Sequence, residues 1–250
     1  MSGGLGSTCT DEDIRAPKSK ESETQNLQMN STLPAKAPKT HRGILSFRQL
    51  NALAIAIVLS ATGMVSIQDI AFVVSSIFYM LFLSKFAFPL SPPSTENTPI
   101  FSPAKNKILA VYVSVGALIG LLLPIVYIFH GIYEGDKEGI KAAVPHVFLL
   151  SSQVFMEGFA FSNRFSIPIR VFVPVFYNAM RILTIMDWLK AEIFKENEGF
   201  GKGSEWRLYV GRGLGVANMA FWSFNLFGFL LPIYLPRAFK RYYGAKEGQD

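Results

Sequence analysis

Residues 49–67 read QLNALAIAIVLSATGMVSI, and no charged side chain interrupts them. A helix needs about 20 mostly apolar residues to cross the roughly 30 Å of hydrocarbon in a bilayer. Residues 69–88 (DIAFVVSSIFYMLFLSKFAF) form a second such stretch after a minimal turn. Asp69 is placed to cap its first turn, and Pro89 is placed to end it. The two stretches therefore predict a tight hairpin of transmembrane helices.

The rest of the chain continues this pattern, so we predict an all-α, polytopic transmembrane helical bundle. Further spans are expected at about 108–130, 142–162, 167–189 and 213–235. The stretch 167–189 leaves the number of spans at five or six, because Arg170, Asn178 and Arg181 fall on one stripe of its helix. Such a stripe suits a helix that faces the bundle interior, and it also suits a helix that lies flat in the interface. Its length and apolar content favour six spans.

The composition agrees with a membrane protein and excludes several other classes. Of the 250 residues, 50% are hydrophobic and only 17% are charged, against about 25% charged residues in a typical soluble domain. The mean hydropathy is +0.29. These values exclude a soluble single-domain protein, a disordered chain and a coiled coil. The net charge of +6 is typical of the inward-facing loops of a membrane protein, so no nucleic-acid partner is expected.

Residues 1–42 differ from the rest, because they are rich in Ser, Thr, Pro, Lys and Glu. Such a segment buries too little apolar surface to fold, so we predict a disordered tail. It lacks the apolar region of a secretory signal, and its acidic residues argue against a transit peptide. Basic residues near its end favour a cytosolic N-terminus. We therefore expect a transmembrane domain over 43–243 and a flexible C-terminus over 244–250, in an endomembrane or the plasma membrane rather than a plastid. Six spans would place the C-terminus in the cytosol as well.

The stretch 142–162 carries polar side chains among apolar ones. His146, Gln153 and Glu157 are spaced by seven and four residues, so they share one helix face. An ionisable group inside a membrane is by default a functional hypothesis, and this face would then line a proton or ion path. In the structural alternative, Glu157 pairs with an arginine and His146 lies near the opposite interface. The candidate intramembrane polar network consists of His146, Gln153, Glu157, Arg170, Asn178 and Arg181.

The structural alternative needs a partner for Glu157. At about 1.5 Å per residue, Glu157 and Arg170 lie at depths that differ by about 3 Å, whereas the depths of Glu157 and Arg181 differ by about 13 Å. We therefore predict a Glu157–Arg170 pair, with Arg181 bonded to Asn178 and carbonyls or directed outward. Without that pair Glu157 would be a free intramembrane acid, which would favour a transporter.

No pattern in the sequence points to catalysis or to a cofactor. The one cysteine, Cys9, excludes an intrachain disulfide and a Cys-based metal site. The three histidines show no metal-ligand spacing, and the nucleophile elbow of a serine hydrolase is absent. The alternating charges of Glu134–Lys141 fit a solvated turn better than a calcium loop. We therefore expect no catalytic residue, no metal and no cofactor.

Small residues and amides indicate how the spans pack together. Glycines four residues apart permit close helix approach, and they occur at Gly116 and Gly120 and at Gly211 and Gly215. Asn218 and Asn225 are expected to form hydrogen bonds between helices. The motif Leu122–Ile125 (LLPI) recurs at Leu230–Ile233, and we interpret this as coincidence rather than an inverted repeat, because the flanking residues do not align.

Four stretches carry a resemblance to a known family, namely Phe47–Ile70, Glu134–Gly158, Ile169–Asn178 and Arg207–Trp222. Through them the chain resembles, from about residue 43 to 243, a plant family of uncharacterised multi-pass membrane proteins known as a domain of unknown function. The resemblance implies a plant protein embedded in a membrane. It supplies no reaction, substrate or site residue.

The sequence therefore favours a protein without enzymatic activity, acting as a structural or interaction subunit of a membrane assembly. The alternative is a small transporter or channel whose polar path is lined by the fourth and fifth spans. The expected partners are the lipid bilayer and either another membrane protein or further copies of the same chain.

Overall fold

The computed structural model of the protein describes residues 46–90, 103–161, 165–195 and 202–247. Every described residue belongs to one compact unit, Arg42–Asp250. The tail expected over 1–42 and the last residues, 248–250, lie outside the described part.

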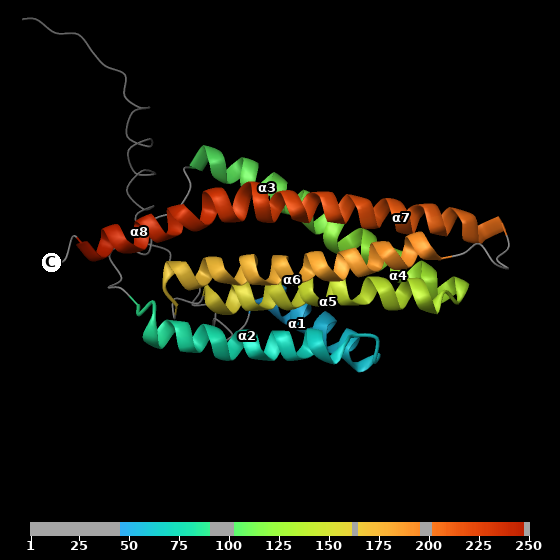
Figure 1. Ribbon diagram of the computed structural model, residues 1–250, viewed down its shortest axis with the longest axis horizontal. Helices are drawn as coiled ribbons and strands as arrows, with labels where there is room; N and C mark the ends of the chain where they lie inside the picture. Colours follow the sequence, from blue (N-terminus) through green and yellow to red (C-terminus); the bar gives the residue numbers. More distant parts are fainter. Residues whose placement is uncertain (1–45, 91–102, 162–164, 196–201, 248–250) are drawn as a thin grey trace, which may run out of the picture. The chain divides into compact units, whose positions relative to one another are not determined.

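All regular structure in the described residues is helical, which confirms the predicted all-α class (Figure 1). In chain order the helices are α1 (Phe47–Ala61), α2 (Ile67–Phe86), α3 (Pro103–Ala117), η1 (Leu118–Leu122), α4 (Leu123–Glu134), α5 (Lys137–Ala160), α6 (Ile167–Phe194), α7 (Lys202–Ser223), η2 (Phe224–Tyr234) and α8 (Leu235–Glu247). The segments η1 and η2 are π-helical. Each lies inside a long continuous helix, so α3–η1–α4 and α7–η2–α8 each form one unbroken rod.

The helices α5 and α6 pack against each other at the centre of the bundle. The helix α1 packs on α5, while α7, η2 and α8 pack on α6. Below the α5–α6 pair in Figure 1 lies α2, and above it lies α7. The segments η1 and α4 pack on α5, whereas α3 leans away from it. Because of this divergence, a wedge-shaped cavity remains beside α3.

Five helices are long and apolar enough to cross a membrane: Ile67–Phe86, Lys107–Glu134, Lys137–Ala160, Ile167–Phe194 and Glu205–Gly244. The first expected span, 49–67, corresponds to the shorter helix α1. It ends at Ala61, because Gly63 adopts a left-handed conformation with φ 67° that a helix cannot contain. The cap of α2 is Ser66, which accepts from the backbone N–H of Asp69, so the expected cap Asp69 lies in the first turn instead.

The doubtful segment 167–189 lies within α6, a 28-residue helix at the bundle centre. Asn178 and Arg181 have no exposed surface, and Tyr177 is 1% exposed. The polar stripe therefore faces the interior, as the first of the two alternatives predicts. Whether the chain crosses a membrane five or six times therefore depends on the short helix α1 and no longer on α6.

The two LLPI motifs occupy equivalent places in the two rods. Pro124 is the second residue of α4, two positions after the end of η1, and Pro232 lies inside η2. A proline lacks the N–H that a helical carbonyl needs and its ring crowds the carbonyl four residues earlier, and a π-helical turn gives the backbone room for it. In both rods the LLPI motif thus coincides with a π-helical segment, although the sequence around the motif does not repeat.

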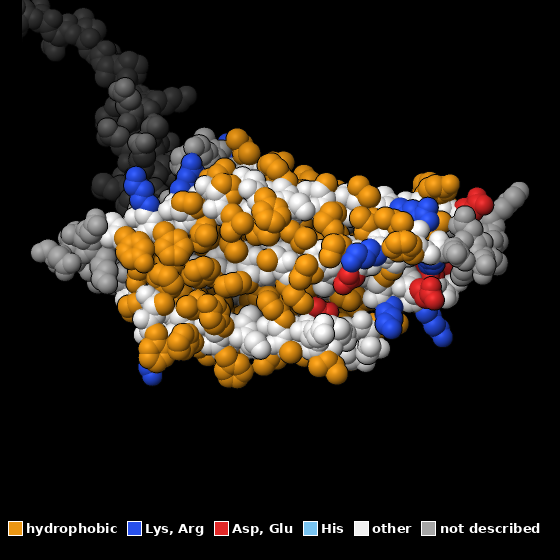
Figure 2. All heavy atoms as spheres, viewed as in Figure 1, with side chains coloured by type: hydrophobic (Ala, Val, Ile, Leu, Met, Phe, Trp, Pro, Cys, Tyr) orange, Lys and Arg blue, Asp and Glu red, His pale blue; other side chains and the backbone are white. Residues whose placement is uncertain are grey.

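Two ends of the bundle are used as landmarks below. The Phe88 end is formed by the end of α2, the end of α5, the start of α6 and α8, where Ser166 Oγ donates to the Phe88 carbonyl at 2.8 Å and Tyr242 donates to the Pro89 carbonyl at 3.1 Å. The Asp136 end is formed by the α4–α5 turn, the end of α6 and the start of α7. Figure 2 shows hydrophobic side chains over most of the surface between these ends, with charged side chains concentrated towards them.

Candidate functional site

A buried cluster around Arg181 connects α5, α6 and α7. The Arg181 guanidinium donates to Gln153 Oε1 at 2.7 Å and to Asn178 Oδ1 at 2.8 Å. It also lies over the Trp222 ring, 3.7 Å from the ring centroid, where a cation is attracted to the aromatic face. Asn178 in turn donates to the Trp222 carbonyl at 3.0 Å. Of the two roles predicted for Arg181, the inward one with Asn178 as partner is the one observed.

Glu157 receives its hydrogen bond from a neutral side chain, because Gln153 Nε2 donates to Glu157 Oε1 at 2.6 Å. The predicted Glu157–Arg170 ion pair is wrong. Arg170 Nε donates to the Phe165 carbonyl at 2.8 Å, and its guanidinium lies 5.8 Å from the centroid of the Phe161 ring. The depth argument fails because similar depth does not bring side chains together: Glu157 and Arg170 lie on the wall of one cavity without meeting.

His146 has a structural partner that follows from Pro124. Because Pro124 has no N–H, the carbonyls four and five residues earlier, those of Gly120 and Ile119, lose the donor that a helix would supply. His146 Nε2 lies 2.9 Å from the Gly120 oxygen, which can only accept, so this nitrogen carries the proton. Asn218 Nδ2 donates to the Ile119 oxygen at 3.0 Å. His146 is therefore part of the packing of α5 on η1, and it lies near enough to Arg181 for the two side chains to interact electrostatically.

A second buried cluster lies at the Asp136 end, and sequence reasoning missed it. Asp136 is 6% exposed and bonds Lys195 Nζ and Arg207 Nε, each at 2.6 Å. It also caps α5 by accepting from the Gly139 N–H at 3.0 Å. The expectation that Glu134–Lys141 is a solvated turn is therefore wrong at Asp136. No local spacing reveals these partners, because they lie 59 and 71 residues along the chain.

The bonds to Asp136 change its proton affinity. Burial alone would raise the pKa of this carboxyl, but the bonds from Lys195, the Gly139 backbone and Arg207 outweigh burial and lower its pKa below the ordinary value of 3.8. Asp136 is therefore ionised at neutral pH, and it holds the two cations that the end of α6 and the start of α7 bring to it.

The same end contains a second buried acid. Tyr127 donates to Glu192 Oε1 at 2.5 Å, and the Arg207 guanidinium lies 4.0 Å from the centroid of the Tyr127 ring. Glu192 is only 1% exposed. Gly211 makes room for it, because a Cβ atom there would lie 2.6 Å from Glu192 Oε2. The absence of a side chain at Gly211 therefore leaves space for the Glu192 carboxylate.

The other glycines singled out in the sequence lie at helix contacts. A Cβ atom on Gly116 would lie 3.0 Å from the Phe221 ring, and one on Gly120 would lie 2.6 Å from the Trp222 ring. At Gly215 the nearest atom would be Leu189 Cδ1, at 3.2 Å. Larger residues would push these helices apart.

A cavity of about 480 Å³ lies beside the Arg181 cluster, in the wedge between α3–η1, α5, α6 and η2. Most of its wall is apolar, with Leu109, Val113, Leu121, Leu150, Phe229 and Leu230 among the lining residues. Gln153 and Glu157 form a polar part of the wall, and three cations also line it, Arg48, Arg170 and Arg241. The cavity wall therefore combines a large apolar surface with the guanidinium groups of three arginines.

The fold and these sites define an all-helical protein with apolar helices of membrane-spanning length and a hydrogen-bonded polar interior. Within that class, the chain belongs to the family described as a domain of unknown function, DUF7733, whose match covers residues 45–243. Neither a curated protein nor a solved structure gives a match to the chain. Its role therefore has to be argued from its own geometry.

Proposed function

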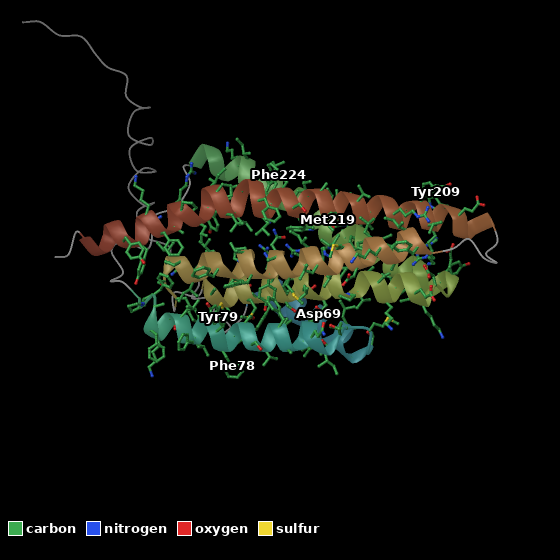
Figure 3. All side chains as sticks on the ribbon, in the orientation of Figure 1. Asp69, Phe78, Tyr79, Tyr209, Met219 and Phe224 are labelled. Atoms are coloured by element: carbon green, nitrogen blue, oxygen red, sulfur yellow. The ribbon has the colours of Figure 1, made fainter. Side chains whose placement is uncertain are left out.

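We propose that the protein is a multi-pass integral membrane protein whose chain crosses the bilayer six times. Five helices have the required length and composition. Large apolar side chains are exposed on both sides of the α5–α6 pair, such as Phe78 on α2 and Phe224 on η2 (Figure 3). Such a surface is unfavourable in water and favourable in lipid.

The sixth crossing in this proposal is α1 with the turn that follows it. Gln49 packs beside Gly158 in the last turn of α5. Val65 belongs to the same apolar cluster as Ile140 in the first turn of α5. Gly158 and Ile140 are 18 positions apart (158 − 140), or about 27 Å at about 1.5 Å per residue. Residues 49–65 therefore extend along a distance close to the hydrocarbon thickness, although the helix α1 itself is short.

The distribution of charge supports an orientation. The cations of the described helices at the Phe88 end include Arg48, Lys85, Lys107, Arg170, Arg237, Lys240 and Arg241, and the acids of those helices at this end are Glu157 and Glu247. At the Asp136 end the described acids are Asp69, Glu134, Asp136, Glu138, Asp187, Glu192 and Glu205, beside a similar number of cations. Because cytosolic loops carry an excess of Lys and Arg, the Phe88 end is assigned to the cytosol, with both chain termini.

A thiol-accessibility experiment tests this topology. Cys9 is the single cysteine in the sequence, so a maleimide reacts with the wild-type protein at this position alone. A membrane-impermeant maleimide should label it in sealed vesicles only from the cytosolic side. In a Cys9→Ser background, Lys240→Cys should react from the same side and Glu138→Cys from the other side. Labelling of Cys9 and Lys240→Cys from opposite sides, or of Lys240→Cys and Glu138→Cys from one side, would overturn the six-crossing topology.

Within the membrane we propose a structural or interaction role without enzymatic activity. The observation that carries it is the use of the interior polar groups as links between helices. Arg181, Asn178, His146 and Asn218 each bond a neighbouring helix, and all four have no exposed surface. These side chains stabilise the packing of α5, α6, α7 and η1.

One observation favours the alternative role of transporter. Glu157 and Gln153 line the cavity, and the predicted partner Arg170 does not neutralise Glu157. The bond from Gln153 nevertheless means that Glu157 is not a free acid, and the wall beyond these two residues is mostly apolar. This combination favours binding in the membrane over the passage of a polar solute.

Two measurements on the purified protein separate these roles. In mild detergent, size-exclusion chromatography with light scattering should reveal a stable assembly of fixed stoichiometry. In sealed proteoliposomes, the fluxes of protons, potassium and chloride should equal those of protein-free vesicles. A flux that Glu157→Gln abolishes would replace the structural role by transport.

A further inference from the structure

We propose that the cavity beside the Arg181 cluster binds an uncharged lipid through its hydroxyl head group, which Glu157 and Asn225 hold at the cavity wall. Diacylglycerols, sterols and long-chain alcohols share this chemistry. The proposal rests on the membrane insertion proposed above and is independent of the subunit role. Its test is a binding measurement in detergent, so an absence of binding would leave the proposed crossings unaffected.

The apolar body of such a lipid fits the wedge beside α3. The cavity volume of about 480 Å³ lies within the range of about 300–1,000 Å³ that is typical of ligand pockets. Its wall is mostly apolar, as at Val113, Leu121 and Leu150. On the outer side of α3, Ile108 and Val111 are 73% and 65% exposed, which suits contact with lipid. An apolar body from the bilayer would gain dispersion contacts with both walls of the cavity.

Both π-helical segments of the described chain lie on this wall. The segment η1 contributes Leu121, and η2 contributes Asn225, Phe229, Leu230 and Tyr234. Turns of π-helix are rare and frequently occur at functional sites. Among the described helices, these departures from α-helical geometry therefore concentrate around one cavity.

Asn225 supplies a hydrogen-bond donor from η2. It is 7% exposed, and it lines the cavity together with Tyr112 and Phe221. The Tyr112 hydroxyl donates to Asn225 Oδ1 at 3.0 Å, while the Tyr112 ring stacks on Phe221 with the centroids 5.1 Å apart. These contacts hold the amide and engage its oxygen, so Nδ2 is the donor that Asn225 can offer to a ligand.

Glu157 supplies a hydrogen-bond acceptor from α5. Gln153 Nε2 donates to Glu157 Oε1 at 2.6 Å, and Gln153 Oε1 accepts from Arg181 at 2.7 Å. Both ends of the Gln153 amide are therefore engaged, and this side chain orients the Glu157 carboxyl. A carboxyl has two oxygens with several lone pairs, so Glu157 can accept a further bond from a ligand hydroxyl at the cavity wall.

The two anchors lie at similar depths in the bundle. Arg181 bonds Gln153 on α5 and lies over Trp222 on α7, so these residues mark one level. Both α5 and the rod that contains α7 and η2 run from the Asp136 end to the Phe88 end (Figure 1). Glu157 follows Gln153 by four positions, or about 6 Å at about 1.5 Å per residue. Asn225 follows Trp222 by three positions, or about 4.5 Å. Glu157 and Asn225 therefore line one cavity at nearly the same level.

A hydroxyl group is complementary to this pair of anchors. It donates one hydrogen bond, which Glu157 can accept, and it also accepts hydrogen bonds, one of which Asn225 Nδ2 can donate. An ionised phosphate or carboxylate only accepts, so it would offer Glu157 no donor. The arginines on the wall are assigned no bond to the ligand. The two anchors therefore favour an uncharged hydroxyl.

Quenching of Trp222 fluorescence tests the proposal on the full-length protein in mild detergent. Trp222 lines the cavity, whereas Trp206 is 68% exposed and Trp188 is buried in an apolar cluster. The change Trp206→Phe therefore removes the tryptophan that a probe in the detergent would reach most readily. The probe is 9,10-dibromooctadecan-1-ol, because bromine quenches tryptophan fluorescence on contact. We expect saturable quenching at one probe per chain.

Competitors that share one alkyl chain define the head group. Oleyl alcohol should displace the probe at about tenfold lower concentration than oleyl methyl ether, which cannot donate a hydrogen bond, or oleate, which is anionic. The relative affinities of dioleoylglycerol and cholesterol then distinguish an acyl body from a sterol body. Equal displacement by oleyl alcohol and its methyl ether would overturn the role of the hydroxyl, and tighter binding of oleate would overturn the uncharged head group.

Two polar variants separate the anchors. In Glu157→Leu, the alcohol and the ether should bind to within about twofold of each other, because the wall no longer accepts from the hydroxyl. In Asn225→Leu, both should weaken by about tenfold while the advantage of the alcohol remains, because both accept through oxygen. Tyr112→Phe is the matched control, since it removes the bond to Asn225 but neither anchor, and it should keep the advantage. An advantage that persists in Glu157→Leu would overturn the role of Glu157, and unchanged affinities in Asn225→Leu would overturn that of Asn225.

Size variants locate the apolar body without any polar change. Ala117 lines the cavity, so Ala117→Phe should weaken oleyl alcohol and its methyl ether by about tenfold. Val111→Phe, on the exposed side of α3, should leave both unchanged. If Glu157→Leu or Asn225→Leu does not fold, these size variants and the competitors on the wild-type cavity still decide. Absence of saturable quenching, or wild-type affinity in Ala117→Phe, overturns the cavity as the site.

Discussion

At the Asp136 end, oppositely charged side chains contact each other, whereas at the Phe88 end charged side chains line a cavity. Asp136 bonds both Lys195 and Arg207, each at 2.6 Å. At the other end, Arg48 and Arg170 line a cavity whose acid is held by an amide. A buried acid that touches its cations fixes helix ends in place, whereas the buried acid at the Phe88 end accepts from an amide in the wall of a cavity. The comparison assigns a stabilising charge cluster to one end and a cavity to the other.

A cavity also lies at the Asp136 end, and it sharpens this contrast. It has a volume of about 450 Å³, lies between α4 and α7, and is lined by His130 and Arg207 among apolar residues. The Arg207 guanidinium is already bonded to Asp136 and to the Tyr127 carbonyl, the latter at 2.9 Å. The two cavities are therefore similar in volume, but the guanidinium beside the second one is held by bonds within the protein.

The largest loss of stability is expected from Asp136→Asn. The change strands Lys195 and Arg207 without their shared carboxylate, and removing one partner of a buried pair costs about 3–5 kcal/mol. Unfolding in detergent, followed by tryptophan fluorescence, measures the loss. Asp187→Asn is the control, because its 3.7 Å pair with Lys190 is exposed and such pairs contribute about 0–1 kcal/mol. Equal losses in the two variants would contradict the stabilising role of the Asp136 end.

Two tyrosine-to-phenylalanine changes compare the two ends of the bundle through smaller expected losses of stability. Tyr127→Phe leaves the buried Glu192 without its 2.5 Å donor, which should cost about 1–3 kcal/mol. Tyr112→Phe removes a 3.0 Å bond to Asn225 on the cavity wall, where the typical net cost is about 0.5–1.5 kcal/mol. The same unfolding assay ranks them, and a larger loss for Tyr112→Phe would reverse the comparison.

Acid should weaken the Asp136 cluster without any mutation. The folded-state pKa of Asp136 is lowered, so its stabilisation is complete above the unfolded value of about 3.9 and is lost as the pH falls through the folded value. The difference in melting temperature between the wild type and Asp136→Asn should stay constant from pH 7 to about pH 5 and shrink below about pH 4. A difference that vanishes near pH 6 would show that the Asp136 pKa is raised instead.

The smallest expected effect is the coupling between Glu157 and Arg170. Because the two side chains do not bond, the losses in Glu157→Gln and Arg170→Gln should add to within about 0.3–0.5 kcal/mol. The matched cycle at the other end, Asp136→Asn with Arg207→Gln, should show coupling of about 0.5–3 kcal/mol. Strong coupling between Glu157 and Arg170 would mean that an ion pair forms at the Phe88 end after all.

Hydropathy and helical periodicity were sufficient to predict the helices but not the contacts between them. The apolar stretches locate the helices, although the last rod runs from Lys202 to Glu247 and so extends well beyond the expected 213–235. The stripe on 167–189 indicates the buried face of α6. Pairs that lie 59 to 71 positions apart, such as Asp136 with Arg207, depend on how the rods align. Depth along a helix could not predict the partner of Glu157, because the direction of each side chain around the helix axis also matters.

One signal for tertiary contacts was nevertheless present in the sequence. Pro124 inside an apolar stretch implies that the carbonyls of Ile119 and Gly120 need donors from elsewhere, since lipid supplies none. A polar side chain on a neighbouring span is then expected to bond them, and His146 and Asn218 do so. The cavity had no such signal, because its cations come from three separate segments.

The dependence of Pro124 on distant donors also has a consequence for biosynthesis. His146 is made shortly after Pro124, but Asn218 follows it by 94 positions (218 − 124). At about 5–20 residues per second, the Ile119 carbonyl waits about 5–20 s for its donor. With the membrane insertion proposed above, the nascent helix would meet the bilayer with an unmet backbone acceptor, and its retention by the insertion machinery until the last helix arrives would avoid that cost.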